Sequence, residues 1–391
     1  MKYRAKSKAI IKPALMQNKG GFLMTVYPTA THGIISRMTG SFFSYHGWPT
    51  VCRSDDGTLY AVCSGFRLQH VCPFGKTVMF VSFDEGKTWT PPIVVNDTYL
   101  DDRDAGIVSL GGGKLLLTWF CHPAETYLNE YYQSIKNSTS KREAILTLGM
   151  LAAFEGLSDK EKQGGSFIRL SHDRGVTWSA QIKVPVSSPH GPALLPDGRL
   201  LYLGKELYSD LPAEDRHAIL AFESRDDGKT WQKLAKIPLP EGTVPDNFHE
   251  PHAIALPDGT LLGAIRAQGA GVDYGFTIYT CRSTDGGRTW SVPAPTGICG
   301  SPPHLLLHSS GALICTYGRR TPPFGERAAI SYNNGITWED EYVIYDGAPD
   351  ADLGYPSTVE LSDGSLLTVY YQKYPGDGKC SLLMTRWRLE K

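Results

Sequence analysis

Residues Ser283-Thr284-Asp285-Gly286-Gly287-Arg288-Thr289-Trp290 have the pattern Ser-x-Asp-x-Gly-x-Thr-Trp. The same eight-residue pattern recurs at 82–89, 171–178, 224–231 and 331–338, with Asn333 in place of Asp in the last copy. Asp and Ser side chains hydrogen-bond neighbouring amides in such a turn, Gly accepts the unusual backbone conformation, and Trp packs between sheets. Each copy has too few carboxylates for a strong calcium site. Five copies therefore predict a repeated structural turn, not an active site.

A second pattern alternates with the first, in which a turn ending in Gly precedes an apolar run. It occurs at Gly57, Gly113, Gly198, Gly259, Gly311 and Gly364. Asp-Gly between apolar runs is a strong hairpin signal. In four units the Gly precedes the Asp or Asn of the next eight-residue motif by 27, 28, 26 and 22 residues, which is room for two strands and a loop. Each unit is therefore expected to have four strands.

Six such units predict an all-β fold, a six-bladed β-propeller that forms a single domain over residues 1–391. The last unit ends too early for a fourth strand, so an N-terminal strand, placed within 21–27, is expected to complete it. The second unit is longer than the others, and its excess, about 124–164, is expected to be a helical insertion. Residues 143–154 suit a helix, and Ser158 to Glu161 matches a capping box. A structural cap or a homo-oligomer contact is favoured over a substrate lid for this insertion.

Composition narrows the range of partners. The 39 basic and 40 acidic residues give no overall field to attract nucleic acid or a membrane surface. The sequence has no apolar run of about 18 residues and no apolar signal core near Met1, which predicts a cytoplasmic protein. The eight cysteines lack Cys-x-x-Cys spacing and are expected to be reduced core residues, so no metal and no cofactor are predicted.

Functional residues are expected at the end of the blades opposite both kinds of turn. The segments before the first strand of each unit, and those after its second strand, are rich in groups that titrate or donate hydrogen bonds. The candidates from these segments are His46, Trp48, Arg67, His70, Asp104, His190, His249, Glu250, Arg266, Arg319, Arg327 and Tyr355. Each of these residues taken alone could have a purely structural role. Taken together they indicate a binding or catalytic site, because Arg side chains bind a carboxylate and a Glu beside a Tyr can take the phenolic proton.

With these motifs the chain resembles the sialidase (neuraminidase) superfamily over nearly its whole length, the repeated turn being that family's Asp box. The resemblance implies Tyr355 as nucleophile, Glu250 as its partner, and Arg266 with Arg319 or Arg327 as ligands of a substrate carboxylate. Two family features are missing. Gly47-Trp48-Pro49 stands where the family has Arg-Ile-Pro, and the segment 65–76 lacks the acid/base Asp.

The sequence therefore predicts a glycan-active enzyme, an exo-acting glycoside hydrolase that removes a terminal acidic or related sugar. His70 or Asp104 is the expected acid/base, and Arg67, His46, Trp48, His249 and His190 are further candidates for substrate binding. Two alternatives remain open. One is another glycosidase or a polysaccharide lyase that uses the histidines at this end of the blades. The other is a glycan-binding propeller without catalysis.

Overall fold

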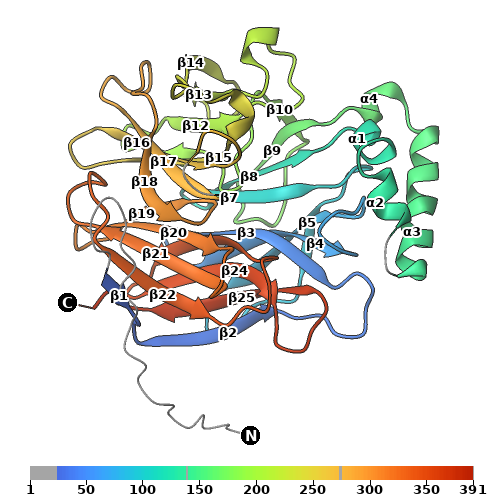
Figure 1. Ribbon diagram of the computed structural model, residues 1–391, viewed down its shortest axis with the longest axis horizontal. Helices are drawn as coiled ribbons and strands as arrows, with labels where there is room; N and C mark the ends of the chain where they lie inside the picture. Colours follow the sequence, from blue (N-terminus) through green and yellow to red (C-terminus); the bar gives the residue numbers. More distant parts are fainter. Residues whose placement is uncertain (1–23, 138–139, 273–274, 391) are drawn as a thin grey trace, which may run out of the picture.

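The structure is a computed structural model that describes residues 24–137, 140–272 and 275–390 (Figure 1). It contains six sheets, each built on four antiparallel strands, which are consecutive in five sheets and include an N-terminal strand in the sixth. The first strands of neighbouring sheets contact one another in a closed ring. The predicted six-bladed β-propeller is therefore confirmed. Side chains that face the axis come from these six strands and from the loops beside them.

The strands are named here by blade. Blade one contains β3 (Tyr45–Arg53), β4 (Leu59–Arg67), β5 (Lys76–Ser82) and β6 (Ile93–Asn96). Blade two contains β7 (Arg103–Gly111), β8 (Lys114–Cys121), β9 (Gly165–Ser171) and β10 (Ile182–Val184). Blade three contains β11 (Ala193–Leu194), β12 (Leu200–Lys205), β13 (Ile219–Ser224) and β14 (Gln232–Lys236). Blade four contains β15 (Phe248–Ala255), β16 (Leu261–Ala267), β17 (Thr277–Ser283) and β18 (Ala294–Cys299).

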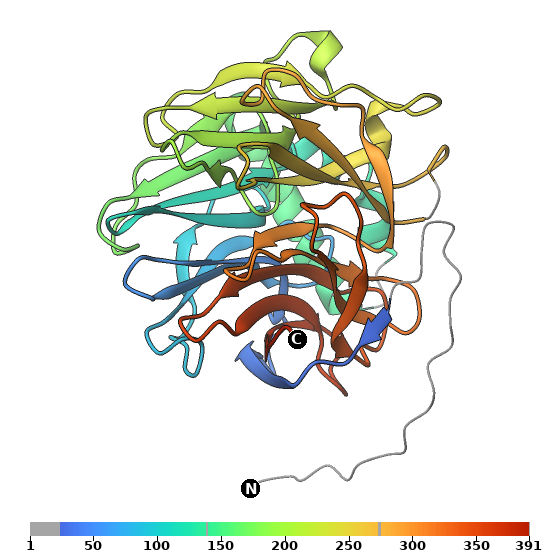
Figure 2. The same ribbon diagram turned by 90° about the vertical axis from the view of Figure 1, so that its left-hand side faces the viewer.

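Blade five contains β19 (His304–Leu307), β20 (Leu313–Arg319), β21 (Gly325–Ser331) and β22 (Asp340–Asp346). Blade six joins β23 (Gly354–Glu360), β24 (Leu366–Lys373) and β25 (Cys380–Trp387) to β2 (Ala30–Ser36), which lies beside the C-terminal strands (Figure 2). The closing strand thus lies later in the chain than the predicted 21–27. Within that range, β1 (Met24–Val26) instead pairs in parallel with β22, and residues 21–23 lie outside the described part.

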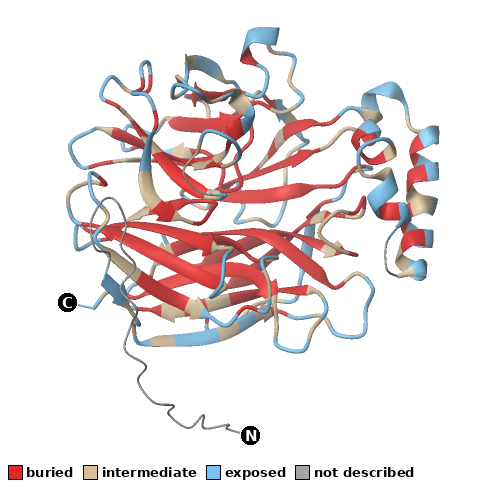
Figure 3. Ribbon diagram, in the orientation of Figure 1, coloured by how far each residue is buried: buried red, intermediate tan, exposed pale blue. Residues whose placement is uncertain are grey.

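The helices lie in the connection between β8 and β9, on one side of the sheets (Figure 1). They are α1 (Ala124–Leu128), α2 (Tyr132–Lys136), α3 (Lys141–Ala153) and α4 (Asp159–Lys162), with the 3-10 turn η1 (Phe154–Gly156). Tyr127, Leu151 and Phe154 pack into the same apolar cluster as Trp119 of β8. The outer faces of these helices are exposed, whereas most of the strands are buried (Figure 3). Two more 3-10 turns are η2 (Ala213–Asp215) and η3 (Pro245–Asn247). None of the described helices is both long enough and apolar enough to span a bilayer.

The Asp-box turn connects the third and fourth strands of a blade, and its own residues stabilise it. In the copy after β17, the Asp285 carboxylate accepts hydrogen bonds from the Thr289 amide at 2.9 Å and from the Thr289 hydroxyl at 2.7 Å. Ser283 Oγ accepts the Gly287 amide hydrogen at 2.9 Å, and Trp290 Nε1 donates to the Gly287 carbonyl at 3.0 Å. Because the Ser, Asp, Thr and Trp side chains of the motif all bond within the turn, the motif is structural, as predicted.

Candidate active site

A pocket of about 390 Å³ opens near the axis, at the end of the blades opposite the hairpin and Asp-box turns. Seven of the predicted residues line it: Trp48, His70, Asp104, His249, Glu250, Arg266 and Tyr355. Five predicted residues, Arg67, His46, His190, Arg319 and Arg327, are not among its lining residues. The sequence therefore located the pocket correctly, although not every side chain that faces it.

Four of the lining side chains are presented by the same backbone feature. Trp48, Asp104, Glu250 and Tyr355 lie in the first strands of their blades, each at a break in the strand register. Their φ angles are 54°, 50°, 47° and 52°, in the left-handed region that residues other than Gly seldom adopt. Such a conformation costs on the order of 1–2 kcal/mol per residue and tends to cluster at functional sites. These bulges turn one side chain per blade out of the strand pattern and toward the pocket.

Tyr355, Glu250 and Arg266 form the central hydrogen-bonded group. The Tyr355 hydroxyl donates to Glu250 Oε1 at 2.5 Å, and Arg266 Nη1 donates to Glu250 Oε2 at 2.6 Å. Burial opposes the ionisation of Glu250, but Arg266 and the Tyr355 hydroxyl outweigh it and lower the pKa of Glu250. Burial, together with the neighbouring carboxylates, raises the pKa of Tyr355 well above its usual value. The group at neutral pH is therefore a neutral phenol bound to an ionised carboxylate.

Asp104 is a second carboxyl group in the same pocket and differs electrostatically from Glu250. It is buried, and no described residue donates a hydrogen bond to its side chain. Burial raises the pKa of Asp104 to about 7, the Glu250 charge acting in the same direction and Arg103 against it. Asp104 therefore holds a proton in much of the physiological range, whereas Glu250 does not. Two carboxyl groups with separated pKa values are the usual sign of an acid paired with a base.

His70 lies in the loop between β4 and β5 and reaches the pocket beside Trp48. Its Nδ1 donates to Asp352 Oδ1 at 3.0 Å, and the Tyr45 hydroxyl donates to the same oxygen at 2.8 Å. With the proton fixed on Nδ1, Nε2 is the acceptor nitrogen of the neutral ring. Burial lowers the pKa of His70 despite the Asp352 hydrogen bond. His70 is thus suited to accept a hydrogen bond or a proton at neutral pH, and Asp104 is suited to donate one.

The pocket's cation from blade five is Arg320, which the sequence analysis did not select. Its guanidinium lies over the rings of Phe276 and Tyr355, with 5.7 Å to each centroid. Its buried Nε and Nη2 have no hydrogen-bond partner among the described residues. The selected Arg319 instead extends toward Glu341, and Arg327 donates to the Tyr345 carbonyl at 2.6 Å. Adjacent residues at a strand end point to opposite faces, so the correct choice depended on register.

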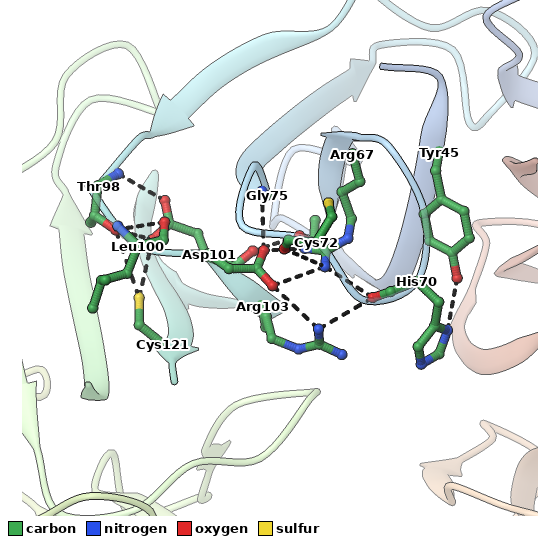
Figure 4. Close-up of polar contacts among 12 residues, drawn as sticks. Tyr45, Arg67, His70, Cys72, Gly75, Thr98, Leu100, Asp101, Arg103 and Cys121 are labelled. Atoms are coloured by element: carbon green, nitrogen blue, oxygen red, sulfur yellow. Dashed lines mark hydrogen bonds and ion pairs between the residues drawn. The ribbon is translucent and has the colours of Figure 1, made fainter. Parts of the chain in front are cut away.

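Arg67 also differs from its prediction as a substrate-binding residue. It is fully buried, and both Arg67 and Arg103 donate to the carboxylate of Asp101 (Figure 4). Both guanidinium groups also stack on the Trp48 ring, at 4.6 Å and 4.1 Å from its centroid. Only Arg103 reaches the pocket lining. Trp48 therefore packs against two guanidinium groups that share the Asp101 carboxylate, and Gly47 stands at the position of the missing Arg.

The predictions for His46 and His190 are wrong as to substrate contact. His46 is fully buried, and its Nδ1 donates to the Ser44 carbonyl at 3.2 Å. His190 packs with His252 and His304 below the pocket, at ring-centroid distances of 5.6 Å and 4.8 Å. Burial lowers the pKa of all four rings, to about 4 for His46 and His252. Among the described residues, no group of His, Cys, Asp and Glu side chains is arranged to hold a metal ion.

The remaining rim residues are paired with one another. Lys205 Nζ donates to the Phe248 carbonyl at 2.9 Å and lies 3.7 Å from Asp246 Oδ1. His217 Nδ1 is 2.7 Å from the same Asp246 oxygen, and His249 Nε2 donates to the Asp246 carbonyl at 2.7 Å. With Lys205 paired to Asp246 and Arg266 to Glu250, Arg320 is the cation of the described pocket lining that has neither a carboxylate nor a hydrogen-bond partner. The only indication of Arg320 in the sequence was its position directly after Arg319.

Known proteins resemble this chain in both sequence and fold. A xyloglucanase from a Paenibacillus species is 31% identical over 219 residues, which cover 50% of this chain but only 20% of that enzyme. A protein of unknown function from Dyadobacter fermentans superposes with a TM-score of 0.71 at 22% identity, over 93% of this chain and 100% of its own. The NanB sialidase of Streptococcus pneumoniae superposes with a TM-score of 0.64 at 15% identity, over 91% of this chain and 70% of its own.

At these identities the structural matches establish a common fold. The repeats establish more, since residues 135–369, over half of the chain, match the BNR repeat-like domain. That match, the five Asp boxes and the six blades agree with the predicted resemblance to the sialidase superfamily. The chain belongs to the BNR repeat-like domain family, and it shares its six-bladed fold with sialidases.

Proposed function

We propose that this protein is an exo-acting glycoside hydrolase that removes a terminal acidic sugar by way of a Tyr nucleophile. The observation that carries the proposal is the hydrogen bond of 2.5 Å from Tyr355 to Glu250, inside a pocket that also holds Asp104. A phenol bound to an ionised carboxylate can lose its proton to that carboxylate as it attacks. Sialidases with a Tyr nucleophile are a known departure from the two-carboxylate pattern of glycosidases.

In the first step, Tyr355 Oη forms a bond to the anomeric carbon and its proton passes to Glu250. The glycosidic bond breaks, and the leaving oxygen takes the proton of Asp104. In the second step, water attacks the anomeric carbon and gives a proton to Asp104, the bond from that carbon to Tyr355 Oη breaks, and Glu250 returns its proton to Tyr355 Oη. The pKa of about 7 for Asp104 suits it to both directions of proton transfer. Asp104 is thus preferred over His70 as the acid/base, because the neutral His70 ring has no proton to give from Nε2.

The charges of the pocket support an acidic sugar. Arg320 forms no ion pair or hydrogen bond with a described residue, and two of its buried nitrogen atoms lack an acceptor. The carboxylates of Glu250 and Asp352 act on it only from a longer distance, so its guanidinium can still bind an anion directly. Arg266 is already neutralised by Glu250, and Gly47 stands where the family has a third arginine. One carboxylate held mainly by Arg320, with Arg266 beside it, is the arrangement that this lining favours.

The relatives support glycan hydrolysis in general, since those with named activities are a xyloglucanase and a sialidase. Because the match spans only a fifth of the xyloglucanase, its polymeric substrate does not transfer to this chain. A neutral Tyr nucleophile gives independent support for an anionic substrate, because a carboxylate nucleophile would repel the sugar's own charge. The sugar and its linkage therefore have to be found by experiment.

The test is a screen of the purified protein against fluorogenic glycosides of sialic acids, uronic acids and neutral sugars. We expect turnover of an acidic glycoside, a loss of at least ~10³-fold in kcat for Tyr355→Phe, and a similar loss for Glu250→Gln. Tyr371→Phe is the matched control, since this buried Tyr packs 6.0 Å from the Tyr355 ring, whereas the hydroxyl bonded to Glu250 is that of Tyr355. Turnover retained in Tyr355→Phe would refute the mechanism.

A polysaccharide lyase is the second candidate, and the geometry of His70 favours it over a binding protein. Nε2 of His70, with Nδ1 held by Asp352, can remove a proton from the carbon beside a uronate carboxylate. The electron pair then forms a carbon–carbon double bond as the glycosidic oxygen leaves with a proton from Asp104. The product has an unsaturated ring that absorbs in the ultraviolet, which hydrolysis does not generate. Appearance of that absorbance, lost in His70→Gln and kept in Tyr355→Phe, would select the lyase.

A further inference from the structure

A second cavity adjoins the proposed reaction pocket, and the two share the side chain of Tyr208. The second cavity has a volume of about 520 Å³, and among its lining residues are Glu125, Lys162, Lys183 and Asp210. It lies between the helical connection of blade two and the loop that follows β12. At 520 Å³ against 390 Å³, it is larger than the pocket proposed to hold the cleaved sugar, so it has room for at least one further ring.

Tyr208 is held rigidly at this junction. The buried carboxylate of Glu206 accepts the Ser209 amide at 2.8 Å and the Ser209 hydroxyl at 2.6 Å at one end of the loop, and the His217 amide at 2.9 Å at the other. Between these anchors Tyr208 has a φ of 55°, an unusual conformation for an aromatic residue. A rigid loop with local strain at the mouth of a site indicates a side chain whose position is functionally constrained.

The ring of Tyr208 is positioned from blade two as well. Its hydroxyl lies 2.6 Å from His122 Nδ1, and the two rings meet edge to face at 5.7 Å. Even so, 37% of Tyr208 stays exposed, and the residue lines both cavities, so a ligand in either one can reach it. An aromatic face beside hydrogen-bonding groups can bind the apolar side of a sugar ring while its hydroxyls are satisfied by the walls.

The walls of the second cavity suit hydroxyl groups better than an apolar partner. Glu125, Glu155 and Asp159 from the helical connection offer acceptors, and Lys162 and Lys183 offer donors. Lys183 and Asp210 form an ion pair at 2.9 Å that is largely exposed, so both ends can still bond a ligand. Mixed charges of this kind would leave a lipid or an apolar aglycone poorly matched.

We infer that the second cavity binds the leaving-group side of an oligosaccharide, with Tyr208 as the platform for the sugar next to the scissile bond. The inference rests on the proposed function, because the orientation of the chain follows from placing the terminal sugar beside Tyr355. It makes the substrate an oligosaccharide or a glycan chain, not a simple glycoside. Recognition then extends from the axial pocket across Tyr208 toward α1 and α4.

The experiment measures binding in Tyr355→Phe protein, so that the ligand survives the titration. Calorimetry compares 3′-sialyllactose with methyl α-sialoside, and trigalacturonic acid with galacturonic acid. The longer member of the recognised pair is expected to bind about 10-fold more tightly, which is the effect of ~1.4 kcal/mol of added contact. Introducing Tyr208→Asn should reduce this preference to less than about 3-fold, because Asn tolerates the left-handed backbone but offers no ring.

The control is Tyr332→Asn, which removes an exposed Tyr from an Asp-box turn at the other end of the blades and should leave the preference unchanged. Equal affinities for the long and short ligands in the parent protein would overturn the inference, as would a preference that survives Tyr208→Asn. Failure of all four ligands to bind would contradict the acidic-sugar proposal on which the inference rests. If an acidic ligand binds but the longer member of its pair binds no more tightly, the proposed role of the second cavity is contradicted and the acidic-sugar proposal is not.

Discussion

Asp104 offers a test of the pocket's electrostatics that needs no substrate. Burial raises its pKa from 3.8 to about 7 in the folded protein. A carboxyl group with a raised pKa binds its proton more tightly in the folded than in the unfolded state. Between pH 3.8 and pH 7 the folded state therefore holds more protons, and its stability falls as the pH rises. At about 1.36 kcal/mol per pKa unit, the ionised Asp104 destabilises the fold above pH 7 by roughly 4 kcal/mol.

The variant Asp104→Asn removes this ionisation and keeps the shape of the side chain. Asn also tolerates the φ of 50° at this position, so the bulge is retained. We expect Asp104→Asn to be more stable than the parent by about 2–4 kcal/mol at pH 8, with the difference disappearing by pH 4. The same variant should lose most activity, because the amide cannot protonate the leaving group.

The assay is urea-induced unfolding of both proteins from pH 4 to pH 8, followed by circular dichroism. Asp102 and Glu326 also have pKa values raised by burial, to about 7 and about 8, so the parent's pH dependence alone does not isolate Asp104. The difference in unfolding free energy between the parent and Asp104→Asn does isolate the contribution of Asp104. A difference in unfolding free energy that stays constant with pH would refute the raised pKa and, with it, the choice of Asp104 as the acid.

Three further results are expected. In Arg320→Gln, KM for the acidic glycoside should rise by roughly 10- to 100-fold, from the loss of a charge-assisted contact with the substrate. Its thermal stability should change little, since no ion pair or hydrogen bond to a described residue is lost. An unchanged KM would exclude Arg320 as the anion site. In the pH profile of kcat/KM, activity should fall as the pH rises through about 7, where Asp104 loses its proton; a profile that stays flat to pH 9 would argue for a different acid. Acid should destabilise the fold through His252, because its ring takes a proton near pH 6.5 in the unfolded chain but only near pH 4 in the folded protein. The variant His252→Asn should therefore recover up to ~3 kcal/mol of unfolding free energy at pH 4 relative to pH 7. Equal pH dependence of unfolding in the parent and the variant would contradict this.

The fold was predictable because its repeats are local. Each Asp box completes its own hydrogen bonds within eight residues, and each Asp-Gly hairpin joins strands that are adjacent in sequence. Counting them therefore counts the blades. The closing strand was misplaced because its partner, β25, lies at the far end of the chain, and the few N-terminal residues carry no repeat to indicate which segment pairs with it.

Glu250 and Tyr355 were predicted from the resemblance to sialidases, and they line one pocket because the closed ring brings the starts of all six blades together. The choice between Arg319 and Arg320 was not. Side chains alternate between the two faces of a strand, and a one-residue difference at its end reverses which one meets the pocket. Arg67 and His46 were equally plausible by position, yet the structure buries both against partners of their own.

The sequence by itself determined the number of blades and the end of the propeller that carries the pocket, and the family resemblance added Tyr355, Glu250 and Arg266 as candidates. These features depend on turns and strand starts, which are determined by residues close together in the sequence. Tertiary structure alone decided that Asp104 is the protonated carboxyl, that Arg320 is the cation without a partner, and that Tyr208 joins two cavities. The reason is that pKa, charge pairing and cavity shape depend on groups from different blades, which meet only when the ring closes.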